Sequence, residues 1–102
     1  MYAVLRLNPL DPDKLAGSSD QLAEFDRIHS SQPGYAGSIT VDLGAGRRFV
    51  VNLWQDEDAS EAAFERLVPE VDRLLKPLLS APSQFIGAGP IVAVDLTGVP
   101  RS

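Results

Sequence analysis

The sequence has no cysteine, one histidine and one tryptophan, and these shortages exclude several kinds of chemistry. Without thiols the chain can form no disulfide, no thiolate nucleophile and no thiolate zinc site. A single histidine cannot complete a transition-metal site of ordinary type, so we expect no bound metal. Any catalysis must rely on side chains other than cysteine.

Long apolar runs are also absent. No stretch approaches the roughly 18–20 apolar residues that a membrane-spanning helix needs, and the chain starts with a strand pattern instead of a basic leader. We therefore expect a cytoplasmic protein with no membrane partner.

Positive charge is scarce as well. Nine Lys and Arg residues stand against 14 Asp and Glu residues, which gives a formal net charge of −5 at pH 7. Binding to nucleic acid depends on Lys and Arg side chains that neutralise phosphates, so the charge balance argues against a nucleic-acid partner.

What the sequence does contain is the composition of a small globular protein. Its 102 residues are 44% apolar and 23% charged, close to the averages for soluble domains. A chain of this length has room for one hydrophobic core, so we expect a single domain over residues 1–102.

The hydrophobic pattern predicts six elements in the order strand, helix, strand, strand, helix, strand. The strands are expected at 2–9, 35–43, 47–55 and within 83–96, and the helical regions at 11–32 and 58–78. A short glycine loop, Gly44-Ala45-Gly46, predicts a hairpin between the second and third strands. This βαββαβ order is typical of the ferredoxin-like α+β fold, an antiparallel sheet with both helices on one side.

The starts of the two helices carry local signals. Asp11-Pro12 has the form of a helix cap, and Gly17 weakens the middle of the first segment, so its regular helix is expected to begin near Ser18. Ser18 and Gln21 have the spacing of a capping box, and Asp58 and Glu61 have the same spacing in the second helix.

Three further irregularities are expected. Pro69 predicts a kink near residues 67–69 of the second helical region. Gly87-Ala88-Gly89-Pro90 predicts a bulge or bend in the last strand, and Val99–Ser102 should fray.

The strand at 47–55 carries large side chains on both faces. Alternation places Phe49, Val51 and Leu53 on one face and Asn52 and Trp54 on the other. Because helices cover one face of such a sheet, the second apolar face needs a partner. We therefore expect a two-fold homodimer that meets through the sheet face.

Five segments share a pattern with one known family. They are the opening Met1–Arg6, the helix end Gln32–Tyr35, the strand Phe49–Trp54, the helix start Glu61–Phe64 and the final valine-rich strand. Together they resemble the dimeric α+β barrel superfamily, specifically the antibiotic biosynthesis monooxygenase-like domains, over almost the whole chain. The resemblance implies a pocket between the sheet and its own helices. Because the superfamily also holds haem-degrading enzymes, isomerases and lyases, these motifs specify the fold more than the reaction.

The resemblance also implies roles for individual residues. Members that oxidise polyketide phenols without a cofactor resemble this chain at the strand-end tryptophan, Trp54, and use a nearby asparagine, for which Asn52 is the closest candidate. The haem-degrading branch combines an asparagine that Asn8 matches, the tryptophan and an iron-ligating histidine on the second helix. No histidine follows residue 29, so the chain departs from that pattern, and we expect no cofactor.

Simpler structural roles exist for the same residues. Trp54 also fits the edge of a hydrophobic core, and Asn8 beside Pro9 fits a strand-end turn. An asparagine inside a strand is disfavoured, so Asn52 should bond either a substrate oxygen or a neighbour such as Arg6 or Asn8.

His29 and Arg6 are the candidates for handling protons and charge. His29 is the one side chain whose ordinary pKa lies near neutrality, so it suits a general base that takes a phenolic proton, yet it also suits a helix end near the negative pole of the dipole. Arg6 suits either an anionic substrate group or an ion pair across the dimer interface.

The predicted function is a cofactor-independent monooxygenase-like enzyme that acts on a small aromatic or hydroxy-aromatic metabolite. The candidate catalytic residues are Trp54, Asn52 and His29, and the candidate substrate-binding residues are Arg6, Asn8, Phe25 and Phe64. Two alternatives remain. The first is a non-catalytic module that binds a small ligand or only assembles, with the pocket closed by Phe25, Phe64 and Trp54. The second is an isomerase or lyase with His29 as its base.

Overall fold

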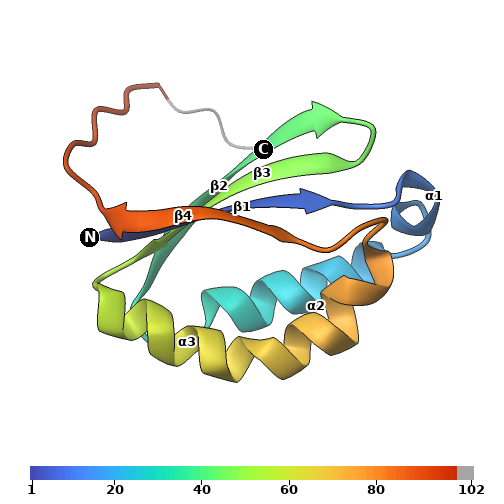
Figure 1. The fold of residues 1–102 in the computed structure, drawn as a ribbon, viewed down its shortest axis with the longest axis horizontal. Coiled ribbons are helices and arrows are strands. Elements are labelled where there is room, and N and C mark those ends of the chain that lie inside the picture. Colours follow the sequence, from blue (N-terminus) through green and yellow to red (C-terminus); the bar gives the residue numbers. More distant parts are fainter. Residues whose placement is uncertain (99–102) are drawn as a thin grey trace.

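Residues 1–98 are described by a computed structural model in which four strands form one antiparallel sheet (Figure 1). The strands are β1 (Tyr2–Pro9), β2 (Tyr35–Gly44), β3 (Arg47–Trp54) and β4 (Gln84–Pro90), and their order in the sheet is β2-β3-β1-β4. Every neighbouring pair is antiparallel. This confirms the ferredoxin-like α+β fold.

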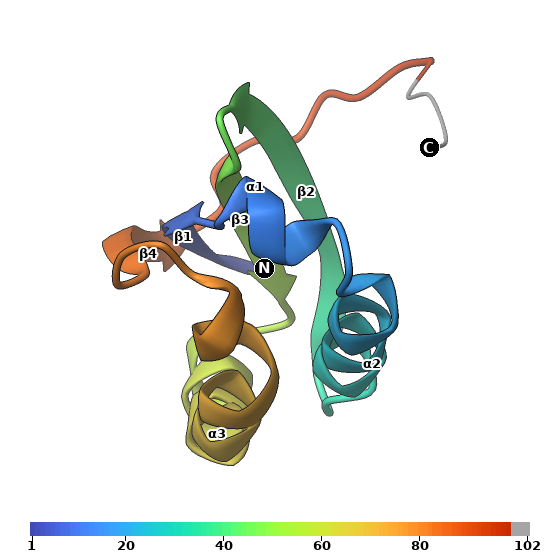
Figure 2. The same cartoon turned by 90° about the vertical axis from the view of Figure 1, so that its right-hand side faces the viewer.

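The helices all belong to the segments that connect these strands. They are α1 (Pro12–Leu15), α2 (Ser19–Ser30) and α3 (Glu57–Glu70), which continues as a π-helical turn, η1 (Val71–Leu75), and a 3₁₀ turn, η2 (Lys76–Leu78). In two perpendicular views, α2 and α3 lie on the same side of the sheet, and no described helix covers the opposite side (Figures 1 and 2). No helix within residues 1–98 is long and apolar enough to cross a membrane.

Both expected capping boxes are wrong. The Ser18 side chain makes no cap hydrogen bond with α2, and Gln21 bonds a different helix. In α3 the cap is Asp56, whose Oδ1 accepts the backbone N–H of Ala59 at 2.7 Å. Because Asp56 is the last residue with extended backbone, Asp58 already lies in the first helical turn and has no free end to cap.

The helix becomes irregular just after Pro69, near the kink expected at 67–69. The helix passes through Pro69 to Glu70 and becomes a π-helical turn only at Val71. Proline lacks the N–H of an ordinary helical residue, and two residues later the N–H of Val71 is shared between the carbonyls of Leu67 and Val68.

The last strand carries its bulge one residue earlier than expected. Phe85 pairs with Arg6 and Gly87 pairs with Leu5, so Ile86 is the extra residue. The expected bulge at Gly87–Pro90 is wrong, because Gly87, Ala88, Gly89 and Pro90 all pair with β1 in regular register. The expected fraying of Val99–Ser102 falls outside the described residues.

The glycine loop forms the expected hairpin between β2 and β3. Gly44, Ala45 and Gly46 all have positive φ angles, of 87°, 55° and 81°. Glycine adopts this region without steric cost, which explains its place at both ends of the turn.

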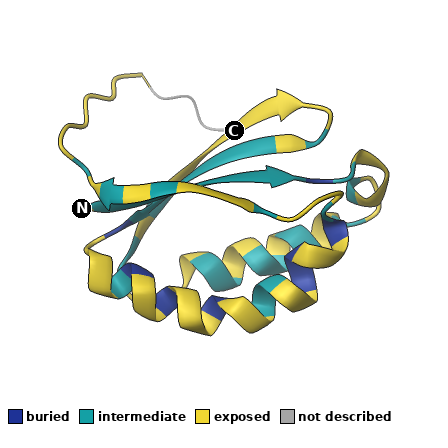
Figure 3. Ribbon diagram, viewed as in Figure 1, coloured by how far each residue is buried: buried dark blue, intermediate teal, exposed yellow. Residues whose placement is uncertain are grey.

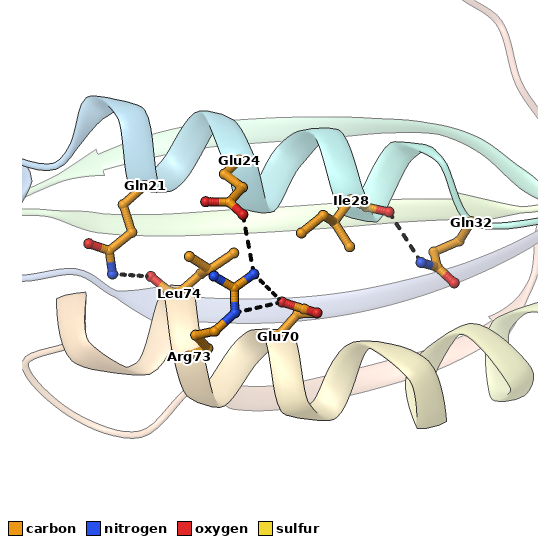
Figure 4. Close-up of polar contacts among 7 residues, drawn as sticks. All are labelled: Gln21, Glu24, Ile28, Gln32, Glu70, Arg73 and Leu74. Carbon is orange, nitrogen blue, oxygen red and sulfur yellow. Dashed lines mark hydrogen bonds and ion pairs between the residues drawn. The ribbon is translucent and has the colours of Figure 1, made fainter.

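Polar contacts fix α2 against the helical region that follows α3 (Figure 4). The Gln21 amide donates to the Leu74 carbonyl at 2.8 Å, and Arg73 bridges Glu24 at 3.2 Å and Glu70 at 2.6 Å. These contacts hold the two helices side by side below the sheet.

The hydrophobic core is divided into two clusters, and few residues are fully buried (Figure 3). One cluster contains Leu10, Leu75 and Leu78, and the other contains Trp54, Ala63 and Leu67. Protein interiors are normally close-packed around one continuous core. Here the two clusters are separate, and a space lies between them. The candidate site occupies that space.

Candidate active site

A cavity of about 610 Å³ lies between the sheet and its helices. Small-molecule sites commonly have volumes of about 300–1,000 Å³, so the cavity has the size of a metabolite pocket. Its sheet wall includes even-numbered residues of β1 and β3: Val4, Arg6 and Asn8 of β1, and Arg48, Val50, Asn52 and Trp54 of β3. The alternation expected for Asn52 and Trp54 therefore holds in the fold.

Strand register sets the order of side chains along this wall. Tyr2 lies opposite Trp54, Val4 opposite Asn52, Arg6 opposite Val50 and Asn8 opposite Arg48. The cavity thus has an aromatic end near Trp54 and a cationic end that carries the two arginines.

Trp54 forms the floor of the aromatic end. It is 3% exposed and packs with Ala63 and Leu67, so it serves the core as well as the cavity wall. Tyr35 meets Trp54 edge to face, with ring centroids 5.8 Å apart. Such pairs stabilise the cluster beyond their buried area and hold the indole in one orientation.

His29 lies among three aromatic rings. Its imidazole centroid is 5.9 Å from Phe25, 5.4 Å from Tyr35 and 5.5 Å from Trp54. Burial lowers the pKa of His29, because the surrounding rings offer the imidazolium no compensating charge. His29 is consequently neutral at pH 7 and able to accept a proton inside the cavity. It also lies in the last turn of α2, where the sequence placed it.

Asn52 points into the cavity from the middle of β3. Within residues 1–98 its side chain bonds neither Arg6 nor Asn8, and it leaves no buried polar atom unsatisfied, since the cavity exposes its amide. Its hydrogen-bonding capacity is therefore open to a bound molecule.

Asn8 is more constrained than Asn52. Its Oδ1 accepts the hydroxyl of Ser83 at 2.5 Å, which ties β1 to the segment before β4. Asn8 still lines the cavity, beside Arg48 on the neighbouring strand.

The two phenylalanines lie at different depths. Phe25 is half-buried against the core cluster of Leu10, whereas Phe64 is 56% exposed at the cavity rim. Phe25, Phe64 and Trp54 all line the cavity.

Several lining residues were not singled out from the sequence. Ser38 and Thr40 continue the even-numbered alternation on β2, and Asp26 precedes His29 by three residues on α2, so periodicity contained their signal. Burial raises the pKa of the Asp26 carboxyl, and the nearby Arg48 cation partly opposes that shift. Ser83 comes from a loop, and no sequence pattern pointed to it.

No group of three or more His, Cys, Asp or Glu side chains in the described part of the chain is arranged to hold a metal ion. The polar groups that face the cavity are an imidazole, amides, hydroxyls, two guanidinium groups and the carboxyl groups of Asp26 and Asp72.

This arrangement of strands and helices also occurs in solved structures of other proteins. Neither a family model nor a curated protein matches the sequence. The structure of NE2512, a protein of unknown function from Nitrosomonas europaea, has a TM-score of 0.72 at 18% identity, over 96% of this chain and 95% of its own. SnoaB from Streptomyces nogalater, a cofactor-independent oxygenase crystallised as an asparagine-to-alanine variant, has a TM-score of 0.69 at 14% identity, over 91% and 94%.

A structure of an antibiotic biosynthesis monooxygenase has a TM-score of 0.62 at 19% identity, over 93% of this chain and 100% of its own. The chain therefore shares the ferredoxin-like α+β fold of these structures. At such identities the likeness concerns the fold, because one fold hosts many reactions.

Proposed function

We propose that the protein is a cofactor-independent monooxygenase-like enzyme that acts on a small aromatic or hydroxy-aromatic metabolite bound in the cavity. The observation that carries this proposal is the arrangement at the aromatic end of the cavity. There the ring centroid of a neutral His29 lies 5.5 Å from that of Trp54. Trp54 shares the sheet wall of the cavity with Asn52, whose side-chain amide is unpaired.

In the proposed reaction His29 accepts the phenolic proton, and the resulting electron-rich anion reacts with dioxygen. One oxygen atom enters the ring and the other leaves as water. The substrate, which becomes a quinone, supplies all four electrons, so no external reductant is required. The Asn52 amide hydrogen-bonds the oxygen intermediate, and Trp54 holds the aromatic ring of the substrate.

Oxygen uptake with phenolic test substrates tests this mechanism. His29→Phe and Asn52→Ala should each lower the rate by about 100-fold or more, the usual effect of removing a positioned base or hydrogen-bond donor. Trp54→Phe should also lower the rate, because the smaller ring holds the substrate less well. Gln84→Ala is the matched amide control, because Gln84 is exposed on β4 outside the cavity. Unchanged oxidation in folded Trp54→Phe and Asn52→Ala proteins would contradict the mechanism.

The same assay separates the alternatives. Turnover that continues without oxygen and requires His29 would indicate an isomerase or lyase. Tight binding without turnover of any test substrate would indicate a binding module.

We also propose that two copies associate through the open face of the sheet. On β2 this face carries Ile39, Val41 and Leu43, which are 46%, 45% and 44% exposed. A row of exposed β-branched and aliphatic side chains beside paired strands is typical of an interface. Val41→Asp should convert the dimer to a monomer in native mass spectrometry, whereas Ala62→Asp, on the exposed side of α3, should not. A wild-type monomer at micromolar concentration would refute this assembly.

A further inference from the structure

Arg6 is a half-buried cation at the cationic end of the cavity. It lines both the main cavity and a second, shallower one of about 450 Å³ that lies against α3 and β4. Within residues 1–98 the ion pairs are those of Arg73 with Glu24 and Glu70, and Arg6 takes part in none. Glu61 and Glu65 line the second cavity, but neither comes within ion-pairing distance of Arg6.

Two aromatic rings hold the guanidinium in place. Its carbon lies 5.9 Å from the ring centroid of Phe64 and 5.6 Å from that of Phe85. Both distances allow cation–π attraction, which extends to about 6 Å. Phe64 comes from α3 and Phe85 from β4, so the clamp is built from segments far apart in the sequence.

Most of the hydrogen-bonding capacity of Arg6 is unused. A guanidinium has five N–H donors, and within the described residues Arg6 makes one long contact, of 3.5 Å, to the Ser83 hydroxyl. That hydroxyl is itself bonded to Asn8. A cation that is positioned on three sides and still has free donors is suited to bind an anion from the cavity.

We propose that Arg6 binds a carboxylate of the substrate, so that the protein accepts hydroxyaryl acids in preference to neutral phenols. This inference rests on the proposed function for the chemistry at the other end of the cavity. Val4 lies opposite Asn52, and Arg6 is the next residue of β1 that faces the cavity. Residues two apart in an antiparallel strand are separated by about 7 Å, so Arg6 lies about that far along the strand from the level of Asn52. A ring placed across that spacing presents its carboxylate to Arg6 and its hydroxyl to Asn52 and His29.

Binding of 4-hydroxyphenylacetate and of its neutral amide, measured by isothermal titration calorimetry, tests the inference without turnover. The wild-type protein should bind the acid about tenfold more tightly than the amide, the effect of one charge-assisted pair that solvent partly screens. Arg6→Met should abolish this preference and leave amide affinity within about twofold, because it keeps the apolar stem of the side chain. Arg66→Met, an exposed arginine on α3 outside both cavities, should keep the preference.

Equal binding of acid and amide by the wild-type protein would overturn the inference, and so would a preference that survives in Arg6→Met or a failure to bind either compound. Amide binding reports that the Arg6→Met pocket is folded, and Arg6→Gln provides a second variant. Acid preference without oxygen uptake would support the role of Arg6 and contradict the proposed oxygenase, whereas oxygen uptake without acid preference would refute the role of Arg6 alone.

Discussion

Acidification should destabilise this protein through His29. Burial among Phe25, Tyr35 and Trp54 lowers the pKa of His29 from its ordinary value of 6.5. The unfolded chain therefore takes up a proton at a higher pH than the folded protein does. Between the two pKa values the unfolded state binds more protons, so the free energy of unfolding falls as the pH falls.

The linkage relation sets the size of this effect. The contribution of His29 is constant well above pH 6.5 and declines below it, with a slope of at most about 1.4 kcal/mol per pH unit, until the pH reaches the folded pKa. Urea unfolding of wild-type protein and of His29→Phe at several values from about pH 5 to 8 isolates this slope, because the two proteins share all other titrating groups. Phenylalanine keeps the ring contacts and removes the titration.

The free energy of unfolding of wild type, relative to that of His29→Phe, should be flat above pH 6.5 and fall below it. An NMR titration of the single histidine gives the folded pKa directly. Parallel stability curves, or a wild-type advantage that grows in acid, would refute the claim that burial keeps His29 neutral. The proposed proton acceptor would then lose its physical basis.

Two further predictions concern stability. Gly46→Ala should lower the free energy of unfolding by about 2 kcal/mol or more, because Gly46 has a φ of 81° and an added Cβ would overlap a backbone carbonyl. The control, Gly17→Ala, has open space around the added Cβ and should be neutral or stabilising by about 0.5 kcal/mol. Thermal unfolding measures both variants. In urea unfolding, Gln21→Ala should lower the free energy of unfolding by about 1–2 kcal/mol, because it removes the hydrogen-bond partner of the Leu74 carbonyl, which belongs to a buried residue (Figure 4). Arg73→Ala should lower it by less, because the Arg73 ion pairs are solvent-exposed. An equal or reversed order would show that the exposed ion pairs hold these helices together.

The parts of the fold that follow from local pattern could be predicted from the sequence. The alternation of residues 47–55 placed Asn52 and Trp54 on one face, and the glycines at 44 and 46 predicted the hairpin. Helix boundaries were less predictable, because Asp56 and Asp58 are chemically equivalent caps. Which of them lies at the helix end depends on where β3 stops, and that is a property of the sheet.

The candidate site was only partly predictable for the same reason. The sequence alone determined which side of β1 and β3 each residue occupies, and which residue types were too rare to build metal or thiol chemistry. Tertiary structure decided that the two core clusters leave a cavity between them, that His29 turns into an aromatic cluster, and that Phe64 and Phe85 enclose Arg6. Periodicity is set by neighbours in the chain, whereas a cavity is set by the packing of segments that are distant in sequence and close in space.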